Sequence, residues 1–261
     1  TVNDLAMMGA KPEYLSCSFI IEEGFPYADL ARIVESMAAE LANSGARIVC
    51  GDTKVVPKGA ADKIFINTSG VGTFPLPEQS RGISVRNLKA GDAILVSRDI
   101  GSHGACILMA RDALQLGSDL KSDCTTLWPQ VEALLKAGIT PHALRDATRG
   151  GLAAVLNEWS SASGVAIELE ESAIPVCDPV RGLCELYGFE PHDLANEGTM
   201  VLALPAEQAQ DALGILRQFN PAASQIGVVQ ASDRHKVILN NPWGSRRYLE
   251  LPQGELLPRI C

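Results

Sequence analysis

Three short segments of this sequence combine glycine with charged or hydroxyl side chains, a composition typical of phosphate-binding loops. The first, Gly51–Lys54 (GDTK), follows a short apolar run, so we expect it at the carboxyl end of a strand, where α/β sheets place ligands. Asp52 offers a hard oxygen ligand for Mg²⁺, and Thr53 and the loop amides can donate to phosphate oxygens. Lys54 or Lys58 can neutralise a transferring phosphate or move a proton. The alternative is an ordinary Gly-Asp turn, and the segment is not a Walker A loop, because GxxxxGK[ST] occurs nowhere in the chain.

The second segment, Arg145–Leu152 (RDATRGGL), places a cation and two glycines directly before a run with helical spacing. Gly150 and Gly151 would let the backbone approach an anion at the helix N-terminus, and Arg149 adds positive charge. The other interpretation is a capped helix with a surface arginine.

The third segment, Asn196–Gly198 (NEG), precedes a predicted strand. Glu197 is either a buried base or an ordinary solvated carboxylate. His103 lies in Gly101–Gly104 (GSHG) and is the only histidine in a glycine-rich segment. The other histidines are expected at ordinary surface positions: His142, His192 and His235.

Asp4 comes just ahead of small and apolar residues that predict the start of a helix. Asn3 or Asp4 can cap that helix through a side-chain oxygen. The carboxylate of Asp4 can equally hold Mg²⁺ on a phosphate. Both interpretations stay open at this point.

The elements that must position these residues follow from hydrophobic periodicity. Apolar residues at helical spacing predict a helix over 27–44, which Gly45 ends, and alternating or β-branched runs predict strands over 15–21, 47–50 and 64–72. The first part of the chain is therefore expected to be β–α–β–β. Beyond a segment rich in Pro, Gly and charge that ends near Asn87–Gly91, strands and helices alternate, so the fold class is α/β or α+β with a domain boundary there.

The composition of the chain argues against some classes of binding partner. The 261 residues carry a formal charge of −9 with 5% aromatic residues, which argues against non-specific binding to nucleic acid or to an anionic membrane. No apolar stretch is long enough to span a bilayer, and no secretory signal opens the chain. The seven cysteines show neither CxxC nor zinc-finger spacing, which favours a reducing compartment and the cytoplasm.

The last 22 residues, 240–261, are rich in Pro and Gly and show no helical periodicity. We expect a mobile, extended arm, for which composition alone would favour simple disorder. Cys261 is the final residue, in the sequence Pro-Arg-Ile-Cys. Periodicity does not single it out from the other six cysteines.

Six segments, in this order along the chain, resemble the HypE family of hydrogenase maturation factors: TVNDLAMMGAKP, GDTKVVPKG, GSHGACIL, RDATRGGL, NEGTMV and the terminal PRIC. The resemblance covers essentially the whole chain. Several of these segments are shared with a wider ATP-dependent superfamily that includes aminoimidazole ribonucleotide synthetase and selenophosphate synthetase. The terminal PRIC is specific to HypE within that group.

The resemblance implies a two-domain PurM-like fold. Residues 1–88 would form an N-terminal ATP-binding and dimerisation domain, 89–239 a C-terminal α/β domain, and 240–261 the arm. Because the sequence begins with Thr1 in mid-motif and the family extends further at its N-terminus, we expect a chain that lacks its native start. Nucleotide binding and homodimer formation in the family also use those earlier strands.

The resemblance also implies a chemistry. The carbamoyltransferase HypF would load a carbamoyl group onto Cys261, and the chain would use ATP and Mg²⁺ to dehydrate this S-carboxamide to a thiocyanate. The cyano group would pass to iron on the HypC–HypD complex, as a ligand of the [NiFe]-hydrogenase site.

The motif residues receive roles from the same resemblance. Asp4 and Asp52 would hold the metal ion. The base is either Lys58 or Glu197, and His103 would orient the carbamoyl group. The remaining candidates would contact ATP and its phosphates: Thr53, Lys54, Arg149 and Gly150.

Two other functions remain to be weighed. Selenophosphate synthetase belongs to the same superfamily but carries its reactive Cys or selenocysteine near the N-terminus, so the terminal PRIC argues against it. A thiol carrier or scaffold that only presents Cys261 to partners is the non-enzymatic alternative.

Overall fold

The structure is a computed structural model that describes residues 1–111 and 119–252. The chain divides into two compact units, which are described separately. The first contains Thr1–Pro75 and Thr126–Glu132, and the second contains Leu76–Thr125 and the chain from Ala133 onward.

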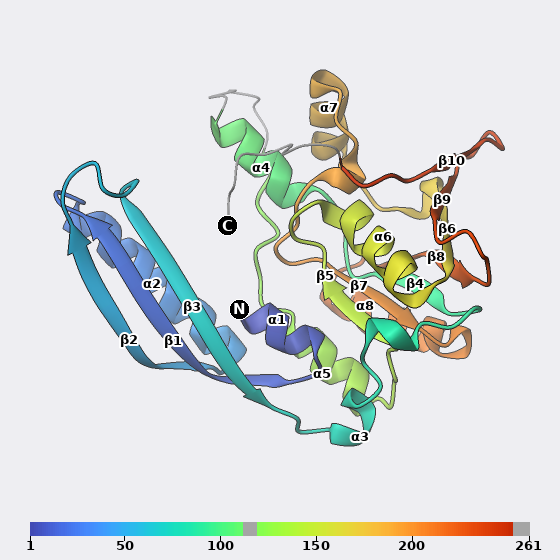
Figure 1. The fold of residues 1–261 in the computed structure, drawn as a ribbon, viewed down its shortest axis with the longest axis horizontal. Coiled ribbons are helices and arrows are strands. Elements are labelled where there is room, and N and C mark those ends of the chain that lie inside the picture. The colour runs from blue at the N-terminus through green and yellow to red at the C-terminus, as the bar shows by residue number, and fades with distance from the viewer. Residues whose placement is uncertain (112–118, 253–261) are drawn as a thin grey trace. The chain divides into compact units, whose positions relative to one another are not determined.

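The first unit is built on a three-stranded sheet of order β2-β1-β3, in which β1 runs parallel to β2 and antiparallel to β3 (Figure 1). The predicted β–α–β–β order is confirmed, with one short helix ahead of it. Its elements are α1 (Val2–Met7), β1 (Lys11–Glu22), α2 (Tyr27–Ser44), β2 (Arg47–Val56) and β3 (Ile64–Thr73). Helix α2 has the predicted bounds, because Gly45 takes a left-handed conformation (φ 73°) that stops it.

Strand β2 is longer than expected and includes the GDTK segment, which was predicted to be a loop. Cys17 to Ile20 of β1 pair with Gly51 to Lys54, so the ladder continues through the segment. Gly51 is required here because an added Cβ would lie 2.0 Å from the carbonyl oxygen of Cys17. Close strand pairing therefore accounts for the glycine that the sequence had placed in a turn.

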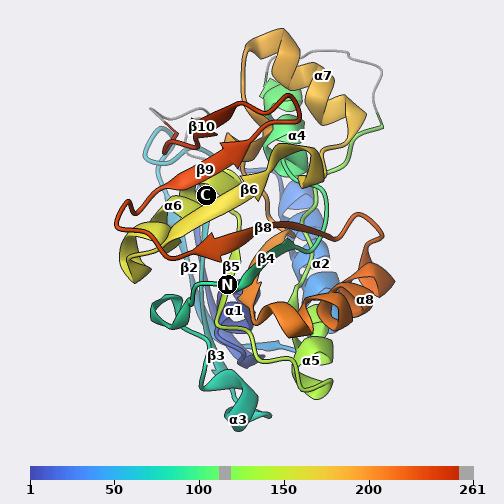
Figure 2. The same ribbon diagram turned by 90° about the vertical axis from the view of Figure 1, so that its right-hand side faces the viewer.

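The second unit is built on a seven-stranded mixed sheet of order β10-β9-β6-β8-β4-β7-β5, in which β9, β6, β8 and β4 can be followed side by side in Figure 2. Its strands are β4 (Ala93–Val96), β5 (Ala143–Asp146), β6 (Ala166–Glu170), β7 (Met200–Leu204), β8 (Ser224–Gln230), β9 (Val237–Asn240) and β10 (Arg246–Tyr248). Its α-helices are α3 (Pro77–Ser80), α4 (Ser102–Arg111), α6 (Gly151–Ser163), α7 (Asp178–Tyr187) and α8 (Ala209–Phe219), and α5 (Trp128–Lys136) begins among the residues grouped with the first unit. Short 3₁₀ turns cover Val85–Asn87, Glu171–Ala173, Pro191–Asp193 and Ala206–Gln208.

The core of the second unit forms where α6 packs on the sheet. The apolar face of α6, including Leu152, Leu156 and Trp159, is buried together with residues of β4, β6, β7, β8 and β9. Burial of these aliphatic side chains is the main driving force that fixes α6, and with it the glycine pair that precedes it.

Residues 240–249 are folded, which corrects the prediction of an extended arm from residue 240. Strand β10 pairs antiparallel with β9, and Leu249 is buried in the core. The side chain of Asn241 accepts a hydrogen bond from the backbone N–H of Trp243, and Gly244 has a φ of +85°, which together close a tight turn. Turn chemistry rather than periodicity therefore defines this hairpin.

No helix in residues 1–111 or 119–252 is long and apolar enough to cross a membrane.

Candidate active site

Three of the predicted segments in the second unit meet at one buried amide, that of Asn196. Its Oδ1 accepts a hydrogen bond from Gly101 N–H over 2.6 Å, and its Nδ2 donates to the carbonyl oxygens of Ala147 and Leu194, each over 3.0 Å. Gly101 belongs to GSHG, Ala147 to RDATRGGL, and Asn196 opens NEG. The fully buried amide therefore ties together segments that are far apart in the sequence.

Asp123 fixes the segment that carries Glu197. It is 1% exposed, and its carboxylate accepts hydrogen bonds from the N–H groups of Glu197 (3.0 Å) and Gly198 (2.9 Å) and from Thr199 Oγ1 (2.9 Å). An added Cβ on Gly198 would lie 1.8 Å from the carbonyl oxygen of Asp123, so only glycine allows this approach. Asp123 was not among the residues singled out from the sequence.

His103 lies on the second residue of α4 rather than in a loop. Its Nδ1 is 2.8 Å from Ser122 Oγ and 3.6 Å from Cys124 Sγ. Partial burial lowers the pKa of His103, and the nearby carboxylate of Asp123 opposes that shift without overcoming it. The imidazole is therefore neutral near pH 7 and can orient a polar group through a hydrogen bond without carrying charge.

Cys124 belongs to the same cluster. Burial around its sulfur raises the pKa of the Cys124 thiol, and the charges of Glu197 and Asp123 raise it further, although the hydrogen bond from Ser122 acts in the opposite direction. The thiol is thus protonated at neutral pH and is not an activated nucleophile. The Glu197 carboxylate is therefore close enough to Cys124 to raise the pKa of its thiol.

Glu197 is half-buried, between a buried Asn196 and a buried Gly198. The sequence left open whether it was a buried base or a solvated loop residue, and its environment is intermediate between the two. Its backbone is fixed on both sides by buried polar side chains. Such a carboxylate is held in position while its side chain remains accessible.

At the start of α6, both glycines of RDATRGGL take left-handed conformations, with φ of 72° at Gly150 and 59° at Gly151. An added Cβ on Gly151 would lie 2.5 Å from the carbonyl oxygens of both His192 and Leu194, so a protein backbone occupies the close approach expected for an anion. Gly150 faces Pro252: an added Cβ there would lie 3.8 Å from Pro252 Cγ. The neighbouring Arg149 is exposed.

In the first unit, Asp52 and Thr53 line a hollow of about 670 Å³ between α2 and the β1–β2 pair. Asp52 Oδ1 accepts a hydrogen bond from Thr53 N–H over 2.8 Å. Most of the remaining lining is apolar and includes Phe19, Met37 and Val49. The hydroxyl can donate to a phosphate oxygen of a nucleotide, and the carboxylate can hold a cation beside the phosphates. The apolar surface can pack against the base.

Lys54 is exposed on β2, and Lys58 is exposed in the turn that follows it. The carboxylate of Glu22 accepts a hydrogen bond from Gly59 N–H, which fixes this turn at one end. Both lysines lie close in sequence to Asp52 and Thr53, and their roles stay predictions.

Asp4 does not cap a helix, and neither does Asn3, because α1 begins at Val2 with Thr1 as its N-cap residue. Asn3 Oδ1 instead accepts a hydrogen bond from Leu127 N–H over 2.8 Å. The side chain of Asp4 is 82% exposed and lies 4.0 Å from the N-terminal ammonium group of Thr1.

Within residues 1–111 and 119–252, no three His, Cys, Asp or Glu side chains are placed to hold a metal ion by themselves. Mg²⁺ commonly binds through one or two carboxylates together with nucleotide phosphates and water, and exposed carboxylates such as Asp4 and Asp52 fit that pattern.

Two histidines assigned to the surface from the sequence are in fact engaged. His192 is 7% exposed, because the 3₁₀ turn that carries it packs against α6. His142 Nδ1 is 2.8 Å from a carboxylate oxygen of the buried Asp92. Neither environment could be foreseen from neighbouring residues, since both depend on contacts distant in sequence.

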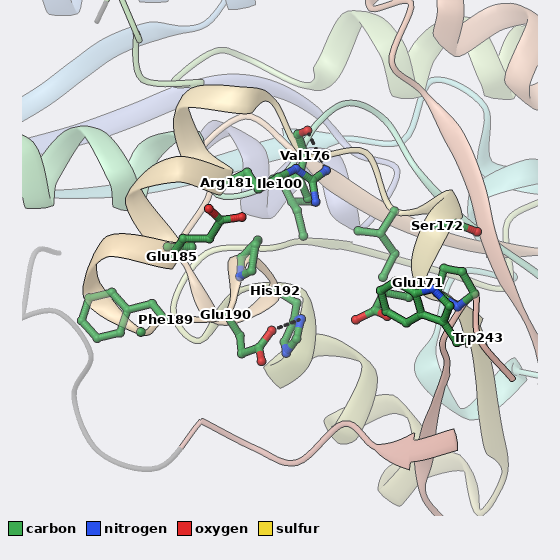
Figure 3. A pocket seen from close by; sticks show the side chains of 15 residues that line it. Ile100, Glu171, Ser172, Val176, Arg181, Glu185, Phe189, Glu190, His192 and Trp243 are labelled. Atoms are coloured by element: carbon green, nitrogen blue, oxygen red, sulfur yellow. Dashed lines mark hydrogen bonds and ion pairs between the residues drawn. The ribbon is translucent and has the colours of Figure 1, made fainter. Parts of the chain in front are cut away.

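A second hollow in this unit, of about 590 Å³, contains His192 and Glu190 but none of the predicted site residues (Figure 3). Burial lowers the pKa of His192 to about 4, despite the opposing effect of the Glu190 carboxylate. At the rim, Trp243 is 88% exposed.

Cys261, the predicted carrier thiol, lies outside the described residues. The last described residue is Pro252, nine positions before it.

Two family models match this chain. Residues 1–74 match the family model for the N-terminal domain of AIR synthase related proteins, and 89–240 match its C-terminal domain. Carbamoyl dehydratase HypE of Azotobacter vinelandii is 46% identical over 100% of this chain and 76% of its own length.

Two solved structures are similar throughout. The crystal structure of HypE in complex with ATP has a TM-score of 0.95 and 41% identity, and the match covers 100% of this chain and 79% of that one. The crystal structure of a HypE–HypF complex has a TM-score of 0.91 and 43% identity, over 97% of this chain and 82% of that one. With this identity over the full chain and with both AIR synthase related domains present, the chain belongs to the HypE family of carbamoyl dehydratases.

Proposed function

We propose that this chain is an ATP-dependent carbamoyl dehydratase that converts an S-carboxamide on Cys261 into a thiocyanate for [NiFe]-hydrogenase maturation. The observation that carries the proposal is the convergence of GSHG, RDATRGGL and NEG on Asn196, with the chain that leads to Cys261 leaving from Pro252 beside Gly150. Nine residues span at most about 30 Å, so the thiol is confined to the neighbourhood of that site.

The reaction proceeds in two steps. The carboxamide oxygen attacks the γ-phosphorus of ATP, and ADP leaves. Removal of the two N–H protons then expels the oxygen as inorganic phosphate and leaves S–C≡N on the sulfur. Cys261 carries the reacting group throughout, and its bond to carbon is not broken.

Glu197 is our first choice for the base, because its backbone is fixed by Asn196 and Asp123 while the carboxylate stays accessible. Lys58 is the other candidate. Neutral His103 orients the carboxamide through a hydrogen bond, and the exposed Arg149 beside Gly150 adds positive charge on the same unit.

The nucleotide binds to the first unit at the hollow lined by Asp52 and Thr53. Asp4 and Asp52 would hold Mg²⁺, which would supply charge neutralisation for phosphoryl transfer. Lys54 contributes positive charge at the same strand. We keep 1–88 as the ATP-binding domain. The C-terminal domain, predicted over 89–239, extends to 249 because β10 and Leu249 belong to its sheet and core, and 250–261 is the segment that delivers the thiol.

We infer that the chain forms a homodimer through the sheet of the first unit. Large apolar side chains remain exposed on its two edge strands, including Val55 on β2 and Phe65 and Val71 on β3. A second copy would cover this surface.

The partners are HypF, which delivers the carbamoyl group, and HypC–HypD, which receives the cyano group. The proposed location is the cytoplasm. The HypE–HypF complex among the similar structures supports the first of these partners.

The deciding experiment loads the full chain with HypF and carbamoyl phosphate and follows the C-terminal peptide by mass spectrometry. We expect the carbamoylated peptide to lose the mass of one water only when ATP and Mg²⁺ are present. A thiol carrier would keep its carbamoyl group under the same conditions, and that result would refute the dehydratase. Cys261→Ala serves as the loading control, since both functions require the thiol.

A further inference from the structure

We propose that Asp123 is a positioning residue for the dehydration step, acting through the backbone of Glu197. This inference rests on the proposed role of Glu197 as the base. Asp123 belongs to the second unit and lies between Ser122 and Cys124, outside the three segments that the sequence singled out.

The geometry around Asp123 is specific. One carboxylate oxygen, Oδ1, accepts from Glu197 N–H, and the other, Oδ2, accepts from Gly198 N–H and Thr199 Oγ1. Three consecutive residues of one loop therefore donate to a single buried anion. Hydrogen bonds of this charge-assisted kind are shorter and stronger than neutral ones.

A neutral side chain of the same shape cannot replace this arrangement. In Asn, one of the two oxygens becomes an NH₂ group, which is a donor only. In one orientation of the amide, the NH₂ group would face the N–H of Glu197, and in the other orientation it would face the N–H of Gly198. The loop must then move or leave a buried donor without an acceptor.

The same segment also contacts His103. Ser122 Oγ lies 2.8 Å from His103 Nδ1, while the next residue, Asp123, binds the backbone of Glu197. Two neighbouring residues thus contact the imidazole and the loop that carries Glu197. A shift of Asp123 would therefore change the distance between the two groups that we assign to the carboxamide. Displacement of a reacting group by about 1 Å is enough to slow an enzyme about 100-fold.

The test compares Asp123→Asn with Ser97→Ala in the full chain. Ser97 is a matched control: it is fully buried, and its Oγ accepts a hydrogen bond over 3.0 Å from the N–H of Met200, the first residue of β7, rather than from Glu197, Gly198 or Thr199. We expect Asp123→Asn to lower kcat for water loss about 100-fold with the KM for ATP unchanged, and Ser97→Ala to leave both values near wild type.

A double-mutant cycle separates positioning from general damage. In a Glu197→Gln background, Asp123→Asn should cause no further loss of rate, because the group that it positions is already absent. An additive loss in that background overturns the inference. If Asp123→Asn has the wild-type kcat while Glu197→Gln is inactive, the positioning role of Asp123 is wrong, but Glu197 remains the proposed base. Full activity of Glu197→Gln overturns both.

If Asp123→Asn fails to fold, Thr199→Val provides the same test with a smaller change. It removes one of the three donors and keeps the carboxylate. We expect about a tenfold loss in kcat with an unchanged KM for ATP. A wild-type kcat in this variant would contradict the inference.

Discussion

The Oδ1 atom of Asn196 accepts a hydrogen bond from Gly101 N–H over 2.6 Å across 95 positions of sequence. The same side chain donates to the carbonyl oxygens of Ala147 and Leu194, so its removal takes a partner from three groups, of which Ala147 keeps the hydrogen bond from the Asn196 backbone N–H. We expect Asn196→Ala to lower the free energy of unfolding by about 2–4 kcal/mol, measured by urea denaturation.

Asn157→Ala is the matched control for that prediction. Asn157 is half-buried, and its amide donates to the carbonyl oxygens of Ala153 and Leu249. We expect a loss of about 1 kcal/mol. Equal losses in the two variants would show that Asn196 has no special role in joining the segments.

Gly198→Ala and Gly214→Ala form a pair that separates a required glycine from a replaceable one. A Cβ at Gly198 would meet the Asp123 carbonyl oxygen at 1.8 Å, whereas a Cβ at Gly214, within α8, meets nothing within 4 Å. Gly198→Ala should reduce both thermal stability and the rate of water loss. Gly214→Ala should raise stability by about 0.5–1 kcal/mol, because alanine favours the helix.

Asp52→Asn should weaken the binding of ATP with Mg²⁺. Removal of a carboxylate that faces bound Mg²⁺ is expected to raise the Kd about tenfold, which corresponds to about 1.4 kcal/mol and can be measured by calorimetry. Asp62→Asn is the control, since Asp62 is an exposed acid in the β2–β3 turn of the same unit. Equal Kd values for the wild type and Asp52→Asn would remove Asp52 from the nucleotide site.

His192 and Asp193 should each make stability depend on pH, but in opposite directions. In the wild type, the two contributions therefore partly cancel. The pKa of His192 is lowered to about 4 by burial, and the pKa of Asp193 is raised to about 6 by burial and by the charge of Glu190. Arg247 opposes the shift of Asp193 and adds to that of His192. Between pH 4 and 6 the two contributions have opposite signs.

In Asp193→Asn only the histidine remains. The unfolded state then binds more protons than the folded state between the folded pKa near 4 and the ordinary value near 6.5, so stability rises with pH across that window, by on the order of 2 kcal/mol. In His192→Gln the folded state binds the extra proton at Asp193, and stability falls from pH 4 to 6. Urea denaturation at pH 4.5 and 6.5 measures both slopes. Slopes of the same sign would contradict the assignment.

Patterns within single segments were sufficient to predict several helices and strands of the fold. Helix α2 has the predicted bounds because a helical stripe and a terminating Gly45 are both encoded within the segment itself. Strand β8 is hard to recognise from the sequence because Gly227 interrupts its apolar residues. The glycine is there because an added Cβ would lie 2.1 Å from the carbonyl oxygen of Glu168 on the neighbouring strand.

The candidate site was predicted less completely, for a related reason. The sequence singled out GSHG, RDATRGGL and NEG, but spacing along the chain does not show that Asn196 joins them. Asp123 is 74 residues from Glu197, and in sequence it resembles any other charged residue before an apolar run. Its function depends on burial, which only the folded chain provides.

The position of Pro252 beside Gly150 has a consequence for how the reaction depends on concentration. A thiol that cannot move more than about 30 Å from its point of attachment has a local concentration of at least about 10 mM, whatever path the nine residues take. An intermolecular substrate would rarely reach that level in a cell. Each molecule therefore carries its own substrate at that concentration, and its rate should not change on dilution.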